Sequence, residues 1–143
     1  MGLVAVLAWA DGCAAGPSEP QPAALGESFT LKAGESARIE AEALQIRFED
    51  VPTDSRCPTD VECVWEGDAT VRVRAQKASR AGERLELHTS AREQTSVVYE
   101  GYEIRLLQLA PHSVSGRTIE QTDYKATLEV TRGSTRSSGT LSR

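Results

Sequence analysis

The sequence predicts an all-β domain, an antiparallel β-sandwich of the immunoglobulin-like type with about seven or eight strands. Three observations support this prediction. Apolar residues recur at every second position, which is the period of a strand with one buried face. Gly, Pro, Asp and Ser mark turns at fairly regular intervals, and no amphipathic helical pattern exceeds about two turns. A β-barrel is the alternative arrangement of the same strands.

The expected N-terminal strands show the alternation in its simplest form. Two short runs, separated by a turn at Ala33-Gly34, precede a longer run in which apolar and polar residues alternate strictly. The residues expected to face the interior are Phe29, Leu31, Ala37, Ile39, Leu44, Ile46 and Phe48.

Four further strands are expected at residues 71–75, 85–87, 102–109 and 124–130. In the third of these, Leu107 and Leu109 fall on the opposite parity from Ile104 and Leu106, which predicts a β-bulge near Leu106 or burial on both faces. Together the strands predict a core of Leu44, Ile46, Phe48, Val71, Val73, Leu85, Leu87, Ile104, Leu106, Leu128 and Val130.

Residues outside these strands predict an exported protein. Residues 1–13 resemble the remnant of a signal peptide, and the segment ADGC resembles a lipobox that would place a lipid on Cys13, although Ala10 and Asp11 depart from the usual pattern. Residues 14–26 contain three prolines and predict a tether. The sandwich is expected at residues 27–131 and a flexible tail at 132–143. We therefore expect the periplasm or cell envelope, with membrane contact only through a lipid anchor.

Composition and charge narrow the class of partner. The chain of 143 residues is 39% hydrophobic and 26% charged, as expected for one folded domain. Its formal net charge is -5, and its Lys and Arg residues are scattered singly along the body of the chain. Nucleic acid is therefore an unfavourable partner, and an unidentified protein or a cationic ligand is expected instead.

Two cysteines, Cys57 and Cys63, lie close together in the most distinctive stretch of the chain. In an exported protein such a pair is expected to form a disulfide. A zinc site would need two further Cys or His ligands nearby, and the segment has none. No metal or cofactor is expected.

Three blocks resemble a family of small bacterial envelope lipoproteins with no established activity. They are FTLKAGESARI with LQIRFEDV, DSRCPTDVECVWEGDATVRV, and GYEIRLLQLAPHSVSG with DYKATLEV. The central block carries the specific motif, DSRCP-x4-CVW-x-G. The resemblance implies a lipoprotein address and an all-β fold, and it supplies no catalytic residues.

Catalysis is not expected from this sequence. A nucleophile needs a neighbouring base, and His88 and His112, the two histidines, lie in no recognisable catalytic motif. We therefore expect a noncatalytic binding or interaction module, with a hydrolase of unrecognised type as an alternative.

The candidate binding loop lies around the two cysteines. Residues 49–68 contain seven acidic residues and one basic residue, Arg56, so this segment has a net charge of -6. A Ca2+-binding module and a protease-inhibitor-like loop are the alternatives, although the spacing matches no EF-hand. Trp65 is expected to pack on the disulfide, with an exposed aromatic at a binding edge as the rival. The candidate loop residues are Asp54, Asp60, Glu62, Trp65, Glu66 and Asp68.

Overall fold

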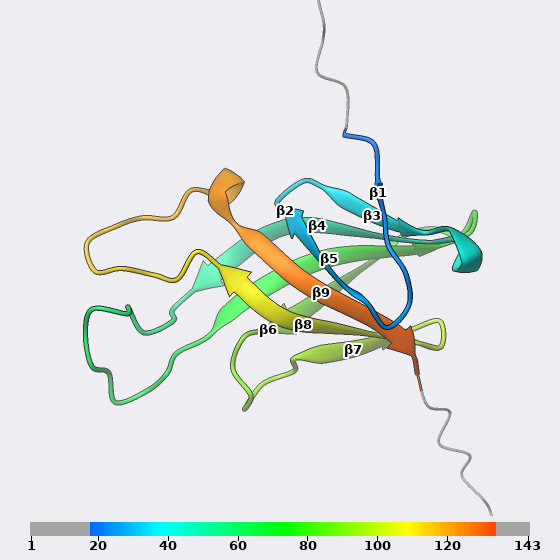
Figure 1. Cartoon of the computed structure of the whole chain (residues 1–143). Helices are drawn as coiled ribbons and strands as arrows, with labels where there is room; N and C mark the ends of the chain where they lie inside the picture. Colours follow the sequence, from blue (N-terminus) through cyan, green and yellow to red (C-terminus); the bar gives the residue numbers. More distant parts are fainter. Residues whose placement is uncertain (1–17, 134–143) are drawn as a thin grey trace, which may run out of the picture.

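A computed structural model, which describes residues 18–133, consists of two facing β-sheets of five and four strands (Figure 1). All strand pairs are antiparallel except one, the pairing of β1 with β3. The predicted β-sandwich is thus confirmed. The barrel alternative is wrong, because the strands divide between two separate sheets and do not close into one.

Four consecutive strands, β3 to β6, lie in one sheet and the last three, β7 to β9, lie in the other, while β1 and β2 are divided between the two. The five-stranded sheet has the order β1 (Gln21–Pro22), β3 (Ser36–Ile39), β4 (Leu44–Asp54), β5 (Ala69–Lys77) and β6 (Glu83–His88). The four-stranded sheet has the order β2 (Ser28–Lys32), β9 (Lys125–Arg132), β8 (Tyr102–Ala110) and β7 (Ser96–Tyr99). Two short 3-10 helices, η1 (Glu40–Glu42) and η2 (Gln121–Asp123), lie in the connections.

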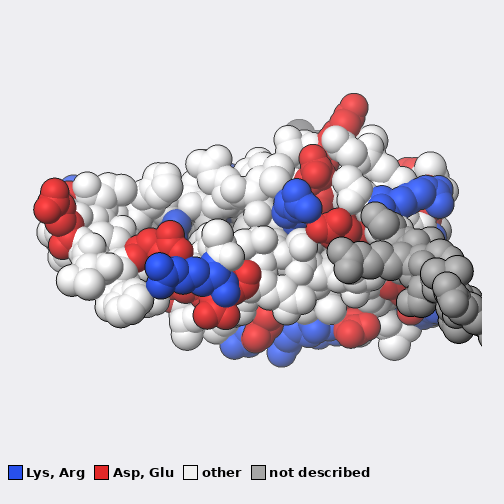
Figure 2. Space-filling view, turned by 90° about the horizontal axis from the view of Figure 1, so that it is seen from below, with Lys and Arg blue, Asp and Glu red and all other residues white. Residues whose placement is uncertain are grey.

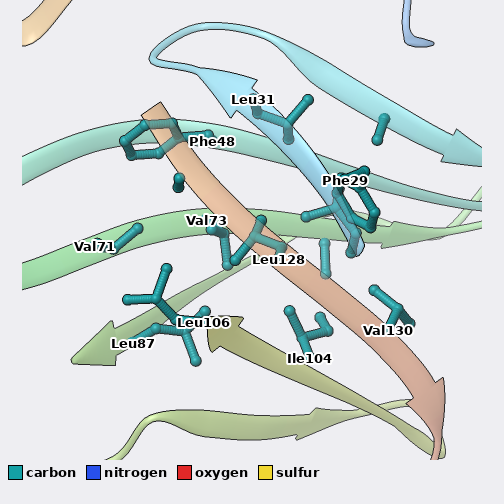
Figure 3. Close-up of a cluster of buried hydrophobic side chains, with 14 of the residues drawn as sticks. Phe29, Leu31, Phe48, Val71, Val73, Leu87, Ile104, Leu106, Leu128 and Val130 are labelled. Atoms are coloured by element: carbon teal, nitrogen blue, oxygen red, sulfur yellow. The ribbon is translucent and has the colours of Figure 1, made fainter. Parts of the chain in front are cut away.

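The core fills the space between the two sheets (Figure 3). Period-two alternation placed it correctly, since every residue of the predicted core except Leu85 is buried, and Leu85 is partly buried against the rest. The fully buried Phe48 and Leu128 come from opposite sheets. The hydrophobic effect of these side chains is therefore what holds the two layers together.

The predicted irregularity in β8 is a bulge. The register of β8 against β9 shifts between Leu106 and Gln108, and Leu107 is 48% exposed. Because one extra residue is inserted there, Leu106 and Leu109 can both face the core despite their opposite parity.

Two strands were missed by the pattern analysis. The strand β7 shows only two alternating apolar residues before it turns back into β8 through Glu100 and Gly101, which both have positive φ. The strand β1 has no alternation at all and pairs in parallel with β3. Its position corrects the tether boundary, because residues 21–26 belong to the domain: Ala23 N donates to Arg38 O at 2.9 Å and Gly26 N to Val130 O at 2.8 Å.

The other expected segments lie at the ends of the chain. The leader at residues 1–13, with Cys13, and residues 134–143 of the tail are outside the described residues. Residues 18–133 contain no helix with the length and apolar character needed to cross a bilayer.

Candidate functional site

Three connections meet at one end of the sandwich, which we call the loop end. They are residues 54–68, from the last residue of β4 to the start of β5, residues 89–95 between β6 and β7, and residues 111–124 between β8 and β9 (Figure 1). Hydrogen bonds join the first and third connections: Thr59 N donates to Ser113 O at 3.0 Å, and Ser115 N donates to Asp60 Oδ1 at 2.9 Å. The loop end is therefore one connected structure.

A buried ion pair between Arg56 and Asp54 holds the base of the first connection. The two side chains are only 10% and 11% exposed, with Arg56 Nη2 2.7 Å from Asp54 Oδ2. The same guanidinium donates to the carbonyl oxygens of Leu109 and Pro111 at 2.8 and 2.9 Å. Since these acceptors lie at the end of β8, Arg56 fastens the 54–68 connection to the opposite sheet.

The same contacts shift two pKa values. Burial opposes ionisation of Asp54, but hydrogen bonds from Arg56 and Tyr124 outweigh it and keep the pKa of the carboxyl below its ordinary value of 3.8. Burial and the hydrogen bond that Tyr124 Oη donates to Asp54, at 2.9 Å, raise the pKa of Tyr124 to about 12. Asp54 is therefore ionised and fully engaged inside the protein.

The predicted disulfide between Cys57 and Cys63 is present, with their Cα atoms 6.0 Å apart. Between the disulfide and the strands, the two arms of the loop run side by side as a narrow ribbon. Cys57 N donates to Glu66 O at 2.8 Å, and Ser55 N donates to Asp68 O at 2.7 Å. Gly67 has φ +70°, and a Cβ atom there would lie 1.9 Å from Ser55 O. Only glycine fits this position, because a side chain would collide with the backbone of Ser55.

Asp68 joins the first connection to the second. Its Oδ2 lies 2.6 Å from His88 Nδ1, and its Oδ1 accepts the backbone N–H groups of Thr89 and Ser90 at 3.0 and 2.9 Å. Ser90 Oγ in turn donates to Glu66 Oε1 at 2.6 Å. Burial opposes ionisation of Asp68, but the hydrogen bonds that it accepts outweigh burial. The pKa of Asp68 is therefore lowered below its ordinary value of 3.8.

The His88–Asp68 pair is the part of the site that most resembles catalytic machinery. Asp68 can orient the imidazole ring, as a carboxylate does in an acid-base pair. Within residues 18–133, however, no Ser, Thr or Cys side chain is hydrogen-bonded to either histidine ring. The observed contacts therefore fit a structural link between two loops.

The structure separates the predicted binding residues into two groups. The carboxylates of Asp54, Asp60, Glu66 and Asp68 each accept a hydrogen bond from their own domain. No group of three or more His, Cys, Asp or Glu side chains within residues 18–133 is arranged to hold a metal ion. Glu62 and Trp65 point outward, and Trp65 is 69% exposed, so the expectation that it packs as a structural residue is wrong.

Trp65 lies beside an open cavity of about 440 Å³. Val64, next to it, is 93% exposed. The cavity lies between the first and second connections and includes Trp65, Glu66, Asp68, Ser90, Arg92 and Glu93 among its lining residues. Sequence reasoning found Trp65 but missed Arg92, whose guanidinium lies 5.7 Å from the centre of the Trp65 ring. No local pattern links two residues that only the fold brings together.

Two smaller cavities also lie at the loop end. One of about 200 Å³ is lined by Arg56, the exposed bulge residue Leu107 and His112. The other, of about 210 Å³, is formed by the third connection around Val114 and Ile119. Hollows and exposed apolar groups thus gather at the same end of the domain.

The loop end is also strongly acidic. Its three connections carry eight carboxylates against three arginines, a net charge of -5 that equals the formal charge of the whole chain. Figure 2 shows acidic side chains at the tip of this end, at the far left of the view. The field around the loop end therefore attracts positively charged groups.

Comparisons of the chain with protein-family models, with curated proteins and with solved structures found no match.

Proposed function

We propose that this chain is a noncatalytic binding module of the bacterial cell envelope, and that it binds a protein partner through its loop end. The observation that carries the proposal is the exposure of Trp65 and Val64 on a loop fixed by a disulfide and a buried ion pair. A rigid aromatic side chain loses little conformational entropy on binding, and tryptophan is enriched among the residues that dominate binding energy.

The proposed envelope location has support from two features of the domain. A disulfide in so short a loop persists in an oxidising compartment. Both described ends of the chain lie away from the loop end (Figure 1). An anchor at Cys13 would thus leave the loop end free to face a partner.

The alternatives have less support from the geometry. A Ca2+ site needs several carboxylates turned toward one point, and four of the five in the 54–68 connection are engaged in separate hydrogen bonds. A hydrolase needs a nucleophile beside His88, and the contacts of His88 within residues 18–133 supply Asp68 instead.

Affinity capture from the native envelope, with quantitative mass spectrometry, tests the proposal. The full chain is compared with the variants Trp65→Ala and Val98→Ala; Val98 is equally exposed, at 69%, but lies on β7 outside the loop end. We expect a partner that is captured by the wild type and by Val98→Ala, and whose capture falls at least about tenfold with Trp65→Ala. Equal capture by all three proteins would exclude the loop end as the binding face.

A further inference from the structure

The loop end presents an aromatic ring, that of Trp65, outside the core. Trp65 follows the disulfide-bonded Cys63 by two residues and precedes Gly67, whose backbone permits no side chain. The backbone is therefore constrained on both sides of Trp65, and the side chain is 69% exposed. A side chain held in this way is available as a preformed contact for another molecule.

The cavity beside this ring has room for one long side chain. Its volume of about 440 Å³ falls at the small end of the range for ligand sites, and it opens to solvent between the first and second connections. Its lining includes Trp65 together with three acidic residues, Glu66, Asp68 and Glu93. An apolar face opposite negative groups suits a side chain with an apolar stem and a cationic head.

The protein already places a cation over this ring. The Arg92 guanidinium lies 5.7 Å from the centre of the Trp65 ring, within the distance of a cation–π contact. Within residues 18–133 the Arg92 side chain forms no ion pair and is exposed. The ring thus accepts a guanidinium group, and the one that it holds is free to move aside.

The charges of the surroundings favour a cationic occupant over an anionic one. Glu66, Asp68 and Glu93 line the cavity against the single positive charge of Arg92. Two of these carboxylates already accept hydrogen bonds from the protein, so they set the sign of the local field and do not form a binding site by themselves. The exposed ring supplies the contact surface.

We infer that the Trp65 cavity receives an arginine or lysine side chain from a basic segment of a protein, which stacks on the indole in place of Arg92. This inference rests on the proposed function and names the chemistry of the partner. The attraction is electrostatic at long range and becomes a cation–π contact at short range, so it weakens as the salt concentration rises.

Tryptophan fluorescence tests the inference directly. Trp9 and Trp65 are the two tryptophans of the chain, so a full-length Trp9→Phe variant reports on Trp65 alone. The probes are a blocked tetra-arginine peptide, a blocked tetra-citrulline peptide that has the same shape without charge, and maltotetraose. We expect only tetra-arginine to change the emission, with an affinity that falls about tenfold or more between 50 and 300 mM salt.

Substitutions separate the cavity from the general charge of the domain. Trp65→Ala, followed by peptide anisotropy, is expected to weaken tetra-arginine binding at least about tenfold, and Val98→Ala to leave it unchanged. Arg92→Ala removes the competing cation and one like charge, so it is expected to tighten binding. Weaker binding by Arg92→Ala, or equal binding of arginine and citrulline peptides, would overturn the inference.

The two proposals fail in different ways. If Trp65 is needed to capture a native partner but tetra-arginine does not bind, the basic-segment inference is wrong and the proposed function stands. A response to maltotetraose without a response to tetra-arginine points to a glycan, and it would overturn both the basic-segment inference and the proposal of a protein partner. If neither capture nor peptide binding depends on Trp65, both proposals are wrong.

Discussion

At the end of the sandwich opposite the loops, β7 turns into β8 through Glu100 and Gly101, whereas at the loop end residues 55–68 separate β4 from β5. Both ends use charged groups to join strands. At the first, Glu42 accepts hydrogen bonds from Tyr102 and Arg132, and Lys77 N donates to Tyr99 Oη at 3.1 Å. We call these five residues the Glu42 cluster.

The two ends differ in what they do with aromatic side chains. In the Glu42 cluster, Tyr99 and Tyr102 are 5% and 6% exposed, and their hydroxyl groups complete the polar network. At the loop end Tyr124 plays the same part with Asp54, but Trp65 is left outside. The buried tyrosines at both ends thus contribute to polar networks that join strands. Trp65 does not contribute to such a network, and its ring is exposed to solvent.

The largest expected effect concerns the two kinds of ion pair. Arg56→Ala should destabilise the domain by about 3 to 5 kcal/mol, because it leaves the buried carboxylate of Asp54 without its partner. Arg80→Ala, which removes the exposed pair with Glu100 near the opposite end, should cost less than about 1 kcal/mol. Urea denaturation of both variants measures the difference, and equal losses would contradict the assignment of Arg56 as the fastening of the loop.

The disulfide should have the next largest effect. Replacing Cys57 and Cys63 together by serine should lower the free energy of unfolding by about 2 to 2.5 kcal/mol, since the open loop gains conformational entropy when the chain unfolds. Denaturation of the double variant checks this value. Intact mass before and after thiol alkylation of the wild type, isolated from its native cells, is the control; two free thiols in that protein would contradict the oxidised state.

Two glycines with positive φ allow a matched comparison. Gly101 has φ +81°, and no atom lies within 4 Å of a Cβ added there. Gly101→Ala should therefore lower the free energy of unfolding by about 1 kcal/mol, through backbone strain alone. Gly67→Ala meets Ser55 O at 1.9 Å and should cost about 1 to 3 kcal/mol more. Thermal or urea denaturation gives both values, and a smaller loss for Gly67→Ala would show that the ribbon is not closed at Ser55.

Acidification should weaken the two ends over different pH ranges. Hydrogen bonds from Tyr102 lower the pKa of Glu42 below 4.5, and those from Arg56 and Tyr124 lower the pKa of Asp54 below 3.8 despite its burial. A lowered pKa in the folded state gives stability that is complete above the ordinary pKa and is lost as the pH falls through the lowered one. Melting temperatures of Glu42→Gln and Asp54→Asn should therefore lose part of their pH dependence, starting near pH 4.5 and near pH 3.8 respectively. Slopes identical to that of the wild type would contradict both assignments.

Sequence reasoning was most accurate where structure depends on local alternation. Leu44, Ile46 and Phe48 face the core as predicted, because successive side chains of a strand point to opposite faces of the sheet. The strand β7 was missed because its signal is the turn at Glu100-Gly101, which suits a type I′ hairpin and was not read as one.

The site was less predictable for a physical reason. Its acidic residues can be read from the sequence, but their partners are distant: Asp60 bonds to Ser115, and Arg56 reaches Leu109 and Pro111. Whether a carboxylate is engaged or free depends on such contacts. The acidic loop could therefore be identified from the sequence, whereas the exposure of Trp65 and its contact with Arg92 required the fold.

The smallest expected effect on stability is that of Trp65 itself. Removing a large aromatic from a packed site costs about 3 to 5 kcal/mol, and Tyr102→Ala in the Glu42 cluster should approach that range because Tyr102 is 6% exposed. Trp65→Ala should change the free energy of unfolding by less than about 0.5 kcal/mol, because most of its ring is in water before and after unfolding. Urea denaturation of the two variants under one set of conditions gives both values. A loss of 2 kcal/mol or more on removing Trp65 would mean that the ring packs as part of the domain, and the contrast between the two ends would then disappear. A negligible loss, together with lost capture of a partner, would separate the stability of the loop end from its use in binding.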